Sequence, residues 1–534
     1  PIRRHLPGLA LLTVCDGLLS LCAVGFAYLS RSFLDEAIAG GLRAAAGSAA
    51  AMVAVVAAQL VMHVLSSMLT EGLTGRISMT LRSGMLEHVL HKTASAMHPL
   101  HPGEVQSRIF SDTAVVAGGV VGILPAAVAI FTRLAAVFAV LIMFDQYLVA
   151  AFAAMGLVLY LASRLVRTRL KKLHTAVQQA DDRQKGGFLE ALERFVIIKA
   201  YSREQTALEG ARDRQKGYFR ARMAKARLNT AVSSGFLLFF RGAYLGVMIY
   251  CAFRLASGDQ AMTFGTLTAL LQLVSQVQQP FASLSGIMPR YYAMTASAER
   301  LARLCEDTET VTPRDCAKIY DRMTAIELRN VTFGYGDTHV LQNASATVQK
   351  GSLTLLSGQT GAGKTTLLTL LMGFYDHSGE IVTDCGDLLD GGTREMFGYM
   401  PQGNMLFSGT VAENICFGEP IDEARLQQAL KISLCDEFVS NLPQGKHTHI
   451  GQEGSALSEG QAQRINLARA IYSGARVLLL DEPTSALDAH TEEQVLRNLS
   501  NLTDHTIIMI SHKSAAQEFC THHLHLQDGR LTQA

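Results

Sequence analysis

The apolar residues of this 534-residue chain follow two different patterns. Up to about residue 300 they form six long runs, each close to the roughly 20 residues that a helix needs to cross a bilayer. A single run of this kind could be a buried core helix, but six in succession predict a helical membrane domain. The runs cover residues 8–30, 46–68, 115–143, 147–165, 230–256 and 263–288.

Two polar stretches between these runs read as continuations of the membrane helices. They cover residues 69–114 and 166–229. At about 1.5 Å per residue, such helices extend tens of ångströms beyond the bilayer, which implies a large partner for them to touch. By contrast, only Asp145-Gln146-Tyr147 separates the third and fourth runs, so we expect a tight hairpin there.

The pattern changes after Leu301. Residues 302–323 are charged and interrupted by Pro313, which indicates a linker. From Thr324 onward, short β-branched runs alternate with helical patterns, as is typical of an α/β domain. We therefore expect a six-helix, all-α membrane domain over residues 1–301 and an α/β domain over residues 324–534.

Composition and charge support a membrane protein. Only 17% of the residues are charged, against about 25% in an average soluble protein. The formal net charge of +1 gives no reason to expect nucleic acid binding. The nine cysteines lack paired metal-type spacing, so we expect reduced, packed thiols.

Lysine and arginine predict the orientation of the helices. About 17 of them lie between Arg164 and Arg227, which places that stretch in the cytoplasm and, with six spans, both termini as well. The N-terminal P-I-R-R-H-L-P is basic and precedes an apolar run without a clear cleavage site, so we expect a retained first membrane helix. The chain does not begin with Met, which leaves open that residues precede Pro1.

A phosphate-binding loop follows the predicted strand Ser352–Leu356 and precedes the predicted helix Leu367–Met372. Its sequence, G-Q-T-G-A-G-K-T-T, contains G-x-x-x-x-G-K-[ST] in the context that this motif requires. The glycines let backbone N–H groups face phosphate oxygens at a helix N-terminus. We expect Lys364 to reach the β- and γ-phosphates and the Thr365 hydroxyl to bind Mg²⁺. The residues predicted to contact ATP here are Gly358, Gln359, Thr360, Gly361, Ala362, Gly363, Lys364, Thr365 and Thr366.

A second apolar strand, Val477–Leu480, ends in Asp481-Glu482. Two carboxylates beside a nucleotide suit an Asp481 that associates with Mg²⁺ and a Glu482 that acts as general base toward water. Together with the phosphate-binding loop, this strand predicts a P-loop NTPase domain that hydrolyses ATP.

Five motifs, in chain order, resemble those of ATP-binding cassette (ABC) transporters. They are Gly358–Thr366 (Walker A), Leu457–Gln461 (signature), Val477–Glu482 (Walker B), Ser485–Asp488 (D-loop) and Ser511-His512 (switch). Six spans before one cassette resemble a half-transporter of the exporter-type (type IV) fold. The resemblance covers nearly the whole chain. It implies ATP-driven transport by alternating access, Mg²⁺, a second half-transporter, and an inner or plasma membrane with the cassette in the cytoplasm.

The same resemblance implies roles for further residues. Tyr335, in V-T-F-G-Y-G, matches the aromatic residue that stacks on adenine, and Gln402, in Y-M-P-Q-G-N, matches the Q-loop glutamine that touches Mg²⁺. His512 matches the switch histidine that contacts the γ-phosphate, and Asp488 matches the D-loop aspartate of the dimer interface. A half-buried strand tyrosine and an exposed loop histidine are the alternative interpretations of Tyr335 and His512.

Two stretches of the membrane half resemble the coupling regions that dock on a cassette. The first is His101–Val105 with Arg108 and Asp112, and the second is Phe188–Gln205. Pro280 in the sixth run also stands where this fold often has a proline.

The signature reads L-S-E-G-Q, whereas the family usually has L-S-G-G-Q, so Glu459 replaces a glycine. In the family this motif, here with Ser458, Gly460 and Gln461, caps the γ-phosphate at the partner cassette. Ser458-x-x-Gln461 is also a capping box, in which a first-turn glutamate is favourable by about 0.3–1 kcal/mol. If its charge instead faces the phosphates at ~6 Å, with an effective dielectric constant of ~20, the repulsion is about 3 kcal/mol, or some hundredfold in rate. In asymmetric heterodimers of this family, one chain keeps the catalytic glutamate beside a weakened signature. Glu482 and His512 beside L-S-E-G-Q resemble that pattern, so the resemblance favours a heterodimer over a homodimer.

Polar residues inside the apolar runs are candidates for substrate contacts. Arg133 and Arg241 favour an anionic or amphipathic substrate if they face a central cavity; a structural pair between Asp16 and an arginine is the alternative. The glutamines of the sixth run could line the same pathway or join helices. The full set is Asp16, His63, Arg133, Arg241, Gln272, Gln276 and Gln279.

Export is the expected direction by analogy, although fold does not determine it. The alternatives are a siderophore or metal-chelate importer of the same fold, a non-transport ABC ATPase that regulates other proteins, and an ATP-gated channel. The six spans continuous with the cassette argue against the regulator.

Overall fold

The computed structural model describes residues 2–98, 100, 102–144, 146–258, 262–306, 311–336, 338–451 and 457–533. Two compact units divide the chain. The first contains Pro1–Glu87 and Gly103–Leu304, and the second contains His88–Pro102 and Cys305–Ala534. The second unit thus includes a short piece of the predicted membrane half.

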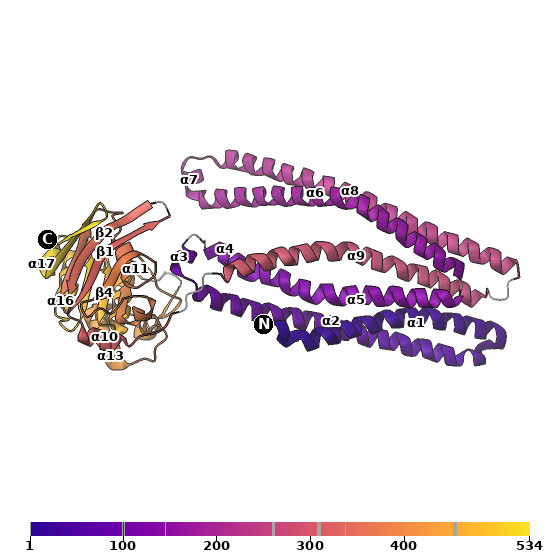
Figure 1. Ribbon diagram of the computed structural model, residues 1–534, viewed down its shortest axis with the longest axis horizontal. Coiled ribbons are helices and arrows are strands. Elements are labelled where there is room, and N and C mark those ends of the chain that lie inside the picture. Colours follow the sequence, from indigo (N-terminus) through magenta and orange to yellow (C-terminus); the bar gives the residue numbers. More distant parts are fainter. Residues whose placement is uncertain are drawn as a thin grey trace. The chain divides into compact units, whose positions relative to one another are not determined.

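The first unit is helical over its described residues except for short turns between the helices. Its helices α2, α6 and α8 run without interruption from apolar into polar sequence (Figure 1). The predicted continuations are therefore confirmed for residues 69–90, 166–193 and 204–229, whereas shorter helices and turns form most of the remaining described residues of the two stretches. The long helices are α1 (Leu6–Ala44), α2 (Ala46–Leu90), α5 (Thr113–Phe144), α6 (Gln146–Glu193), α8 (Glu204–Ala256) and α9 (Phe264–Leu304). The short ones are η1 (Ile2–His5), α4 (Pro102–Ser107), the π-helical turn η2 (Arg108–Asp112) and α7 (Phe195–Ala200).

Among the described residues, four helical segments are long and apolar enough to cross a membrane. They are Arg3–Gly41, Ala46–Leu90, Pro102–Phe144 and Glu204–Ala256, and α6 adds a shorter apolar stretch, Tyr147–Val158. These four contain the first, second, third and fifth predicted runs. The fourth and sixth runs lie in helices α6 and α9. Asp145, in the predicted hairpin, lies outside the described residues, between the ends of α5 and α6.

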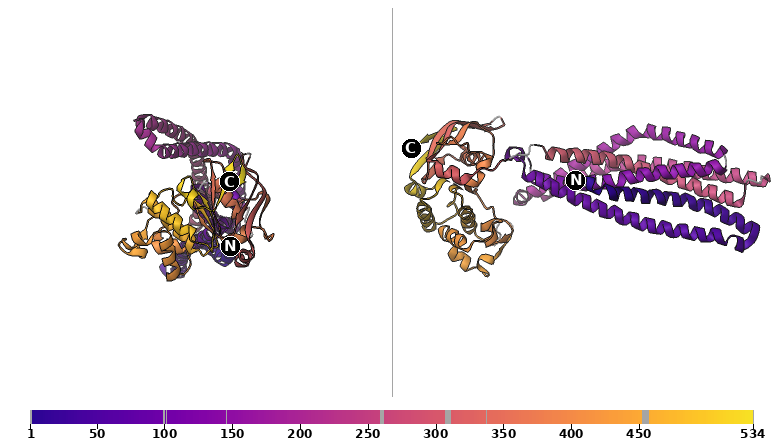
Figure 2. Two further views of the ribbon diagram at one scale, coloured as in Figure 1. Left: turned by 90° about the vertical axis from the view of Figure 1, so that its left-hand side faces the viewer. Right: turned by 60° about the horizontal axis from the view of Figure 1, so that its bottom comes forward.

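Five of the six long helices described above pack in two sets, and α2 shares a buried apolar cluster with α1 and α5. Helices α1, α5 and α9 pack on one another, and α6 packs along α8 (Figures 1 and 2). Apolar side chains such as Val24, Leu141 and Leu270 form the core between them. At one end of α5, the carboxylate of Asp112 accepts hydrogen bonds from Arg300 Nε and Ser297 Oγ, both at 2.9 Å. Asp112 of the first predicted coupling region therefore joins η2 to α9; His101 of that region lies outside the described residues.

The second unit has the α/β organisation that the sequence predicts. One sheet is antiparallel, in the order β2-β1-β4, and a larger one has the order β11-β10-β3-β9-β8-β5, parallel except for β11. The strands are β1 (Ala325–Tyr335), β2 (Thr338–Gln349), β3 (Leu353–Gly358), β4 (Ser378–Thr383), β5 (Phe397–Met400), β6 (Gly409–Thr410), β7 (His449–Ile450), β8 (Val477–Asp481), β9 (Thr506–Ile510), β10 (His522–Gln527) and β11 (Arg530–Gln533).

Short helices surround these sheets. They are α3 (Ala94–Met97), α10 (Cys316–Arg322), α11 (Lys364–Leu371), α12 (Val411–Cys416), α13 (Glu423–Ile432), α14 (Asp436–Ser440), α15 (Glu459–Tyr472), α16 (Ala489–Ser500), α17 (Ala515–Phe519), η3 (Gly391–Met396) and η4 (Gly445–His447). Helix α10 falls within the stretch expected to be a linker, and its Ile319 and Tyr320 are buried in the core.

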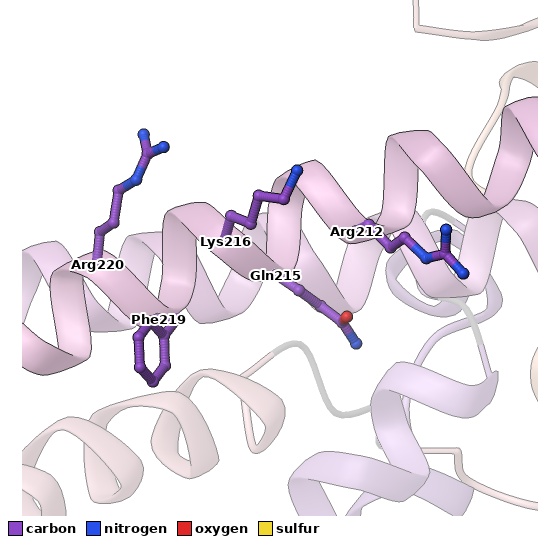
Figure 3. Close-up of a pocket in the computed structure, with 5 residues that line it drawn as sticks. All are labelled: Arg212, Gln215, Lys216, Phe219 and Arg220. Carbon is purple, nitrogen blue, oxygen red and sulfur yellow. The ribbon is translucent and has the colours of Figure 1, made fainter.

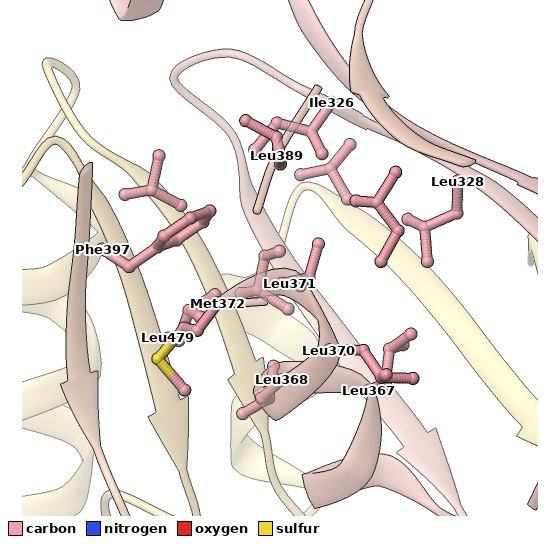
Figure 4. Close-up of a cluster of buried hydrophobic side chains, with 14 of the residues drawn as sticks. Ile326, Leu328, Leu367, Leu368, Leu370, Leu371, Met372, Leu389, Phe397 and Leu479 are labelled. Carbon is pink, nitrogen blue, oxygen red and sulfur yellow. The ribbon is translucent and has the colours of Figure 1, made fainter. Parts of the chain in front are cut away.

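Helix α11 lies at the centre of the largest apolar cluster of this unit (Figure 4). Its Leu367, Leu368, Leu370 and Leu371 are all buried, as expected for a helix covered on every side. Strands β3 and β8 flank β9 in parallel, so their carboxyl ends meet at one edge of the sheet. The phosphate-binding loop and Asp481-Glu482 are thereby brought together.

Candidate functional site

The loop after β3 has a backbone that only glycine adopts readily. Gly358, Gly361 and Gly363 have φ values of +148°, +82° and +100°, a region that other residues rarely enter. A Cβ at Gly358 would lie 2.3 Å from the Leu526 carbonyl oxygen. Gly363 precedes α11 without a side-chain cap. The first N–H groups of α11 are therefore available to an anion.

Lys364 is buried in this loop with 7% of its surface exposed. Its Nζ donates to the carbonyl oxygens of Gly358 and Gln359, at 2.8 and 2.9 Å. Burial lowers the pKa of Lys364, while the charges of Glu482 and Asp481 oppose this shift. The ammonium group thus lies inside the phosphate-binding loop, close to two carboxylates.

Thr365 and Asp481 are in direct contact. Thr365 Oγ1 donates to Asp481 Oδ2 at 2.6 Å, and Asp481 is 2% exposed. Burial raises the pKa of Asp481, although the bond from Thr365 opposes the shift. A hydroxyl and a carboxylate oxygen are ligands that Mg²⁺ prefers, and a cation would stabilise the buried charge. These residues therefore fit a Mg²⁺ ion.

Glu482 has a left-handed backbone with a φ of +52°. Such a conformation costs a non-glycine residue on the order of 1–3 kcal/mol and is concentrated at functional sites. The Glu482 N–H donates to the Ile510 carbonyl oxygen at 3.0 Å, and Glu482 Oε1 lies 3.7 Å from His512 Nε2. The structure thus brings together two of the three predicted catalytic residues. The third, Gln402, is exposed just after β5 at the same edge of the sheet.

Tyr335, the predicted adenine-stacking residue, is half-buried at the end of β1 and makes a stacking contact. The ring of His98 lies parallel to its ring, with centroids 4.9 Å apart. The rings of Phe333 and Tyr375 meet Tyr335 edge-on, and its hydroxyl is 3.5 Å from Thr366 Oγ1. Nothing in the sequence around His98 indicated this contact.

The predicted capping box of the signature is present. The Gln461 N–H donates to Ser458 Oγ at 3.3 Å, and the Ser458 N–H donates to Gln461 Oε1 at 3.0 Å. Glu459 is exposed in the first turn of α15. A Cβ at Gly460 would lie 2.9 Å from the Ala486 carbonyl oxygen. A small residue at position 460 therefore lets the signature approach the D-loop.

Gln463 joins the signature helix to the Walker B glutamate and the D-loop. Its Nε2 donates to the Glu482 carbonyl oxygen at 2.6 Å and to Ser485 Oγ at 2.8 Å. Its Oε1 accepts from the Ala486 N–H at 3.0 Å. The sequence analysis missed this residue, although it belongs to the same Q-A-Q-R stretch as Gln461.

Lys513 joins the switch loop to the D-loop. Its Nζ donates to the carbonyl oxygens of Thr484 and Leu487, at 2.7 and 3.0 Å. It also pairs with Glu492 Oε2 at 3.1 Å, and Glu492 is 4% exposed. The Thr484 hydroxyl donates to the other oxygen of Glu492 at 2.9 Å. The sequence analysis did not predict these contacts of Lys513, and the only indication of them was its position next to His512.

Asp488 has a local structural role as the N-cap of α16. Its side chain accepts from the Thr491 N–H at 3.0 Å and from the Thr491 hydroxyl at 2.8 Å. These hydrogen bonds lower the pKa of Asp488. Asp488 is exposed, so its expected place at a dimer interface remains a prediction.

The candidate substrate residues lie on three different helices of the first unit. Arg133 is half-buried on α5, Arg241 is exposed on α8, and Gln272 and Gln276 are half-buried on α9. Gln276 Nε2 donates to the Ala23 carbonyl oxygen of α1 at 2.6 Å, so this glutamine joins two helices. The side chain of Gln279 lies outside the described part of the structure.

The other two polar positions of this set are on α1 and α2. The Asp16 carboxylate of α1 accepts a hydrogen bond from the Ser66 hydroxyl of α2. His63 is exposed on α2. Asp16 therefore has a partner on the neighbouring helix that is not an arginine.

Comparison with known proteins gives matches in both units. Residues 9–281, more than half of the chain, match the family described as ABC transporter transmembrane region. Residues 341–485 match the family described as ABC transporter. A solved structure described as a bacterial Atm1-family ABC exporter with ATP bound aligns with a TM-score of 0.82 and 23% identity, over 99% of this chain and 94% of the other. That likeness establishes the fold.

Two curated relatives illustrate the range of similar proteins. An ATP-dependent lipid A-core flippase of Syntrophus aciditrophicus is 28% identical over 447 residues, which are 82% of this chain and 74% of the relative. A mycobactin import ATP-binding/permease protein of Mycolicibacterium smegmatis is 35% identical over 272 residues, which are 50% of this chain and 47% of the relative. The chain matches about half the length of the second relative.

Proposed function

This chain belongs to the ABC transporter family and is a membrane-spanning ATP hydrolase coupled to transport, and we propose that it is one half of a dimeric exporter. The observation that carries the proposal is the meeting of two residue pairs beside the phosphate-binding loop. Thr365 and Asp481 form one pair, and Glu482 and His512 form the other. A Mg²⁺–ATP complex held by the loop would have its terminal phosphate near both pairs.

Each residue of the site has a separate proposed role in ATP hydrolysis. Lys364 and the loop N–H groups would hold the phosphates, and Thr365 and Asp481, with Gln402, would hold Mg²⁺. The bound ion would supply positive charge that offsets the negative charge developing on the phosphate oxygens. Glu482 accepts the proton of the attacking water. His512 donates a hydrogen bond to the γ-phosphate and lies close enough to Glu482 to orient it. The left-handed backbone of Glu482 supports this role, because strain is concentrated at reacting groups.

A second half-transporter completes each ATP site in this proposal. Ser458, Gly460 and Gln461 of one cassette cap the phosphate bound at the other, and Asp488 lies at the interface between them. Two bound ATP molecules close the cassettes, the coupling regions reorient the membrane helices, and hydrolysis resets them. The intact Glu482 and His512 beside the substituted signature favour a heterodimer.

The proposed substrate is anionic or amphipathic, and the proposed direction is export. Arg133 and Arg241 supply positive charge on two helices of the membrane unit, and lipid A-core, the substrate named for one relative, is both anionic and amphipathic. The mycobactin import relative supports an importer as the alternative. The bacterial origin of the flippase and mycobactin import relatives favours the inner membrane as the location.

Reconstituted vesicles test this function directly. The assembled transporter, which is this chain together with its second half-transporter, would be inserted into liposomes that contain a fluorescent anionic lipid, with ATP added to the side of the cassettes. We expect ATP-dependent transfer of the lipid between leaflets, and none with Glu482→Gln. A variant of an exposed glutamate on α16, Glu493→Gln, is the matched control and should transfer lipid normally.

The assembly is tested on the chain expressed alone. A stable dimer that hydrolyses ATP would mean a homodimer, in which Glu459 is a tolerated helix-cap residue. A monomer, or a dimer that is inactive until a second half-transporter is supplied, would mean a heterodimer. ATP hydrolysis that no lipid or membrane solute changes would instead favour a regulatory ATPase.

A further inference from the structure

Helices α6 and α8 leave their apolar segments together and form a two-helix stem that ends at α7. Contacts along the stem fix which residues are level. His174 Nδ1 lies 2.9 Å from Lys225 Nζ, and farther out Arg214 Nη2 lies 3.9 Å from Glu190 Oε2. Residues 164–180 of α6 therefore lie beside the α8 segment that begins near residue 219, and residues 214–218 lie beside the outer part of α6.

Charge is divided sharply along this stem. The outer part, residues 181–213, contains seven acidic and six basic residues, so its charges nearly cancel. The inner part, residues 164–180 and 214–230, contains no acidic residue and eleven basic ones. We call this inner part the collar. Its basic residues are Arg164, Arg167, Arg169, Lys171, Lys172, Arg214, Lys216, Arg220, Arg222, Lys225 and Arg227.

The basic side chains of the outer part and of the collar also differ in their ion pairing and exposure. In the outer part, ion pairs neutralise basic groups, as between Lys185 and Asp181 at 2.7 Å. At the outer edge of the collar, Lys216 pairs with Asp213 at 2.9 Å and Arg214 with Glu190 at 3.9 Å. Nearer the apolar runs, Arg169, Lys172 and Arg227 are exposed. The close-up of α8 shows Lys216 and Arg220 projecting from the same side of the helix, with Phe219 on another side (Figure 3). Lys216, Phe219 and Arg220 line a hollow of about 410 Å³ together with Arg212 and Gln215.

Helix geometry places part of the collar next to the bilayer surface. The apolar run of α6 ends near residue 165, and that of α8 begins near residue 230. At 1.5 Å per residue, Arg169, Lys172 and Arg227 lie within roughly 10 Å of these ends. Long cationic side chains reach further toward the headgroups. The outer residues Arg183 and Arg212 lie roughly 27 Å away, well beyond the screening length of about 8 Å.

We propose that the collar binds the phosphate groups of anionic phospholipids in the adjacent leaflet. Clusters of lysine and arginine next to a membrane helix attract such lipids, and the attraction falls off within a screening length. The outer stem cannot contribute, because it is both distant and nearly neutral. The collar thus gives α6 and α8 an electrostatic attachment to the membrane surface at the base of the stem.

Two triple variants of the full chain test this proposal. Arg169→Gln, Lys172→Gln and Arg227→Gln remove three collar charges, two on α6 and one on α8. Arg183→Gln, Lys185→Gln and Arg212→Gln remove three outer charges in the same distribution, and form the matched control. Each protein is purified from an equal mixture of phosphatidylglycerol and phosphatidylcholine, and its retained lipids are counted by native mass spectrometry.

We expect the unmodified chain to retain phosphatidylglycerol preferentially. The collar variant should lose at least about two thirds of that excess, and the control variant little of it. Inorganic phosphate at millimolar concentration should displace none of the lipid. Equal retention of both lipids by the unmodified chain, or equal losses in the two variants, would refute the proposal.

A salt titration keeps the proposal testable if the collar variant does not fold. The unmodified chain should lose its excess phosphatidylglycerol as sodium chloride rises from about 0.05 to 0.5 M, because screening weakens contacts between exposed charges. Retention that is independent of salt would contradict the proposal. None of these measurements depends on ATP hydrolysis, so their failure is distinct from failure of the proposed transport function.

Discussion

His512 Nε2 lies 3.7 Å from Glu482 Oε1. The two residues follow neighbouring parallel strands, β9 and β8, so the sheet itself sets their separation. Two hydrogen bonds further hold the backbone of Glu482 in place. Its N–H donates to the Ile510 carbonyl oxygen, and Gln463 Nε2 donates to the Glu482 carbonyl oxygen. A proton acceptor and a hydrogen-bond donor are thereby presented side by side at the edge where the phosphate-binding loop ends.

Loss of the switch imidazole should slow hydrolysis without abolishing nucleotide binding. We expect His512→Ala to lower kcat at least about tenfold, because it removes both the predicted phosphate contact and the neighbour that orients Glu482. The affinity for a fluorescent ATP analogue should stay within about threefold. His490→Ala is the control, since His490 is exposed on α16 and contacts Gln494. Equal effects of the two substitutions would contradict the assignment.

The buried carboxylate of Asp481 should destabilise the protein when no cation is bound. Burial raises the pKa of Asp481, so ionisation at neutral pH opposes folding. We therefore expect Asp481→Asn to raise the melting temperature at pH 7 in the absence of nucleotide and Mg²⁺. The difference in melting temperature between the variant and the unmodified chain should shrink as the pH falls through the raised folded-state pKa of Asp481 toward its unfolded-state pKa of about 4. The same variant should lose Mg²⁺-dependent ATP hydrolysis.

Asp488→Asn is the comparison variant, because the pKa of Asp488 is shifted in the opposite direction to that of Asp481. Hydrogen bonds from Thr491 lower the pKa of Asp488, so its ionised form favours folding above the unfolded-state pKa. Asp488→Asn should therefore not raise the melting temperature at pH 7. Thermal unfolding of both variants between pH 4 and 8 measures the difference. A stabilising Asp488→Asn, or a destabilising Asp481→Asn at pH 7, would show that the pKa argument is wrong.

Lys513 should act as a positioning residue for the D-loop and the switch loop. Lys513→Met leaves the buried Glu492 without its cation, and an unsatisfied buried polar group costs about 1–3 kcal/mol, at the lower end here because Lys513 is one third exposed. We expect a lower melting temperature and a lower kcat with little change in KM. Lys513→Arg should restore both, and adding Glu492→Gln to Lys513→Met should restore part of the stability. A kcat unchanged in Lys513→Met would exclude the positioning role.

Two substitutions test whether the charge or the size of the Glu459 side chain affects ATP hydrolysis. We expect Glu459→Gln and Glu459→Gly to raise ATP hydrolysis in the assembled transporter, because both remove a charge that opposes the closing phosphates, by up to about a hundredfold. Both variants should also lose up to about 1 kcal/mol of stability, because the first turn of α15 loses a favourable charge, and Glu459→Gly should lose more, because glycine has a lower helix propensity. An unchanged rate in both variants would mean that Glu459 acts as a helix-cap residue alone.

Local sequence patterns were enough to predict the parts of the site that lie within single elements. The P-loop, the strand that ends in Asp481-Glu482, and the Ser458–Gln461 capping box each depend on residues a few positions apart. The contacts of Lys513 with Glu492 and of His98 with Tyr335 join residues that are distant in sequence. They depend on strand order and on packing between elements, which periodicity does not encode. The helix formed by residues 316–322 escaped prediction for the same reason, because the core stabilises it.

The most direct test of the whole account is the ATP hydrolysis rate of the assembled transporter in nanodiscs, compared between the unmodified chain and Glu482→Gln. The account predicts that hydrolysis falls at least about tenfold, as expected on losing a general base, while ATP binding remains intact. Glu493→Gln should hydrolyse ATP at the unmodified rate. Unchanged turnover in Glu482→Gln would contradict the account, because the proton would then have to leave the attacking water by another route.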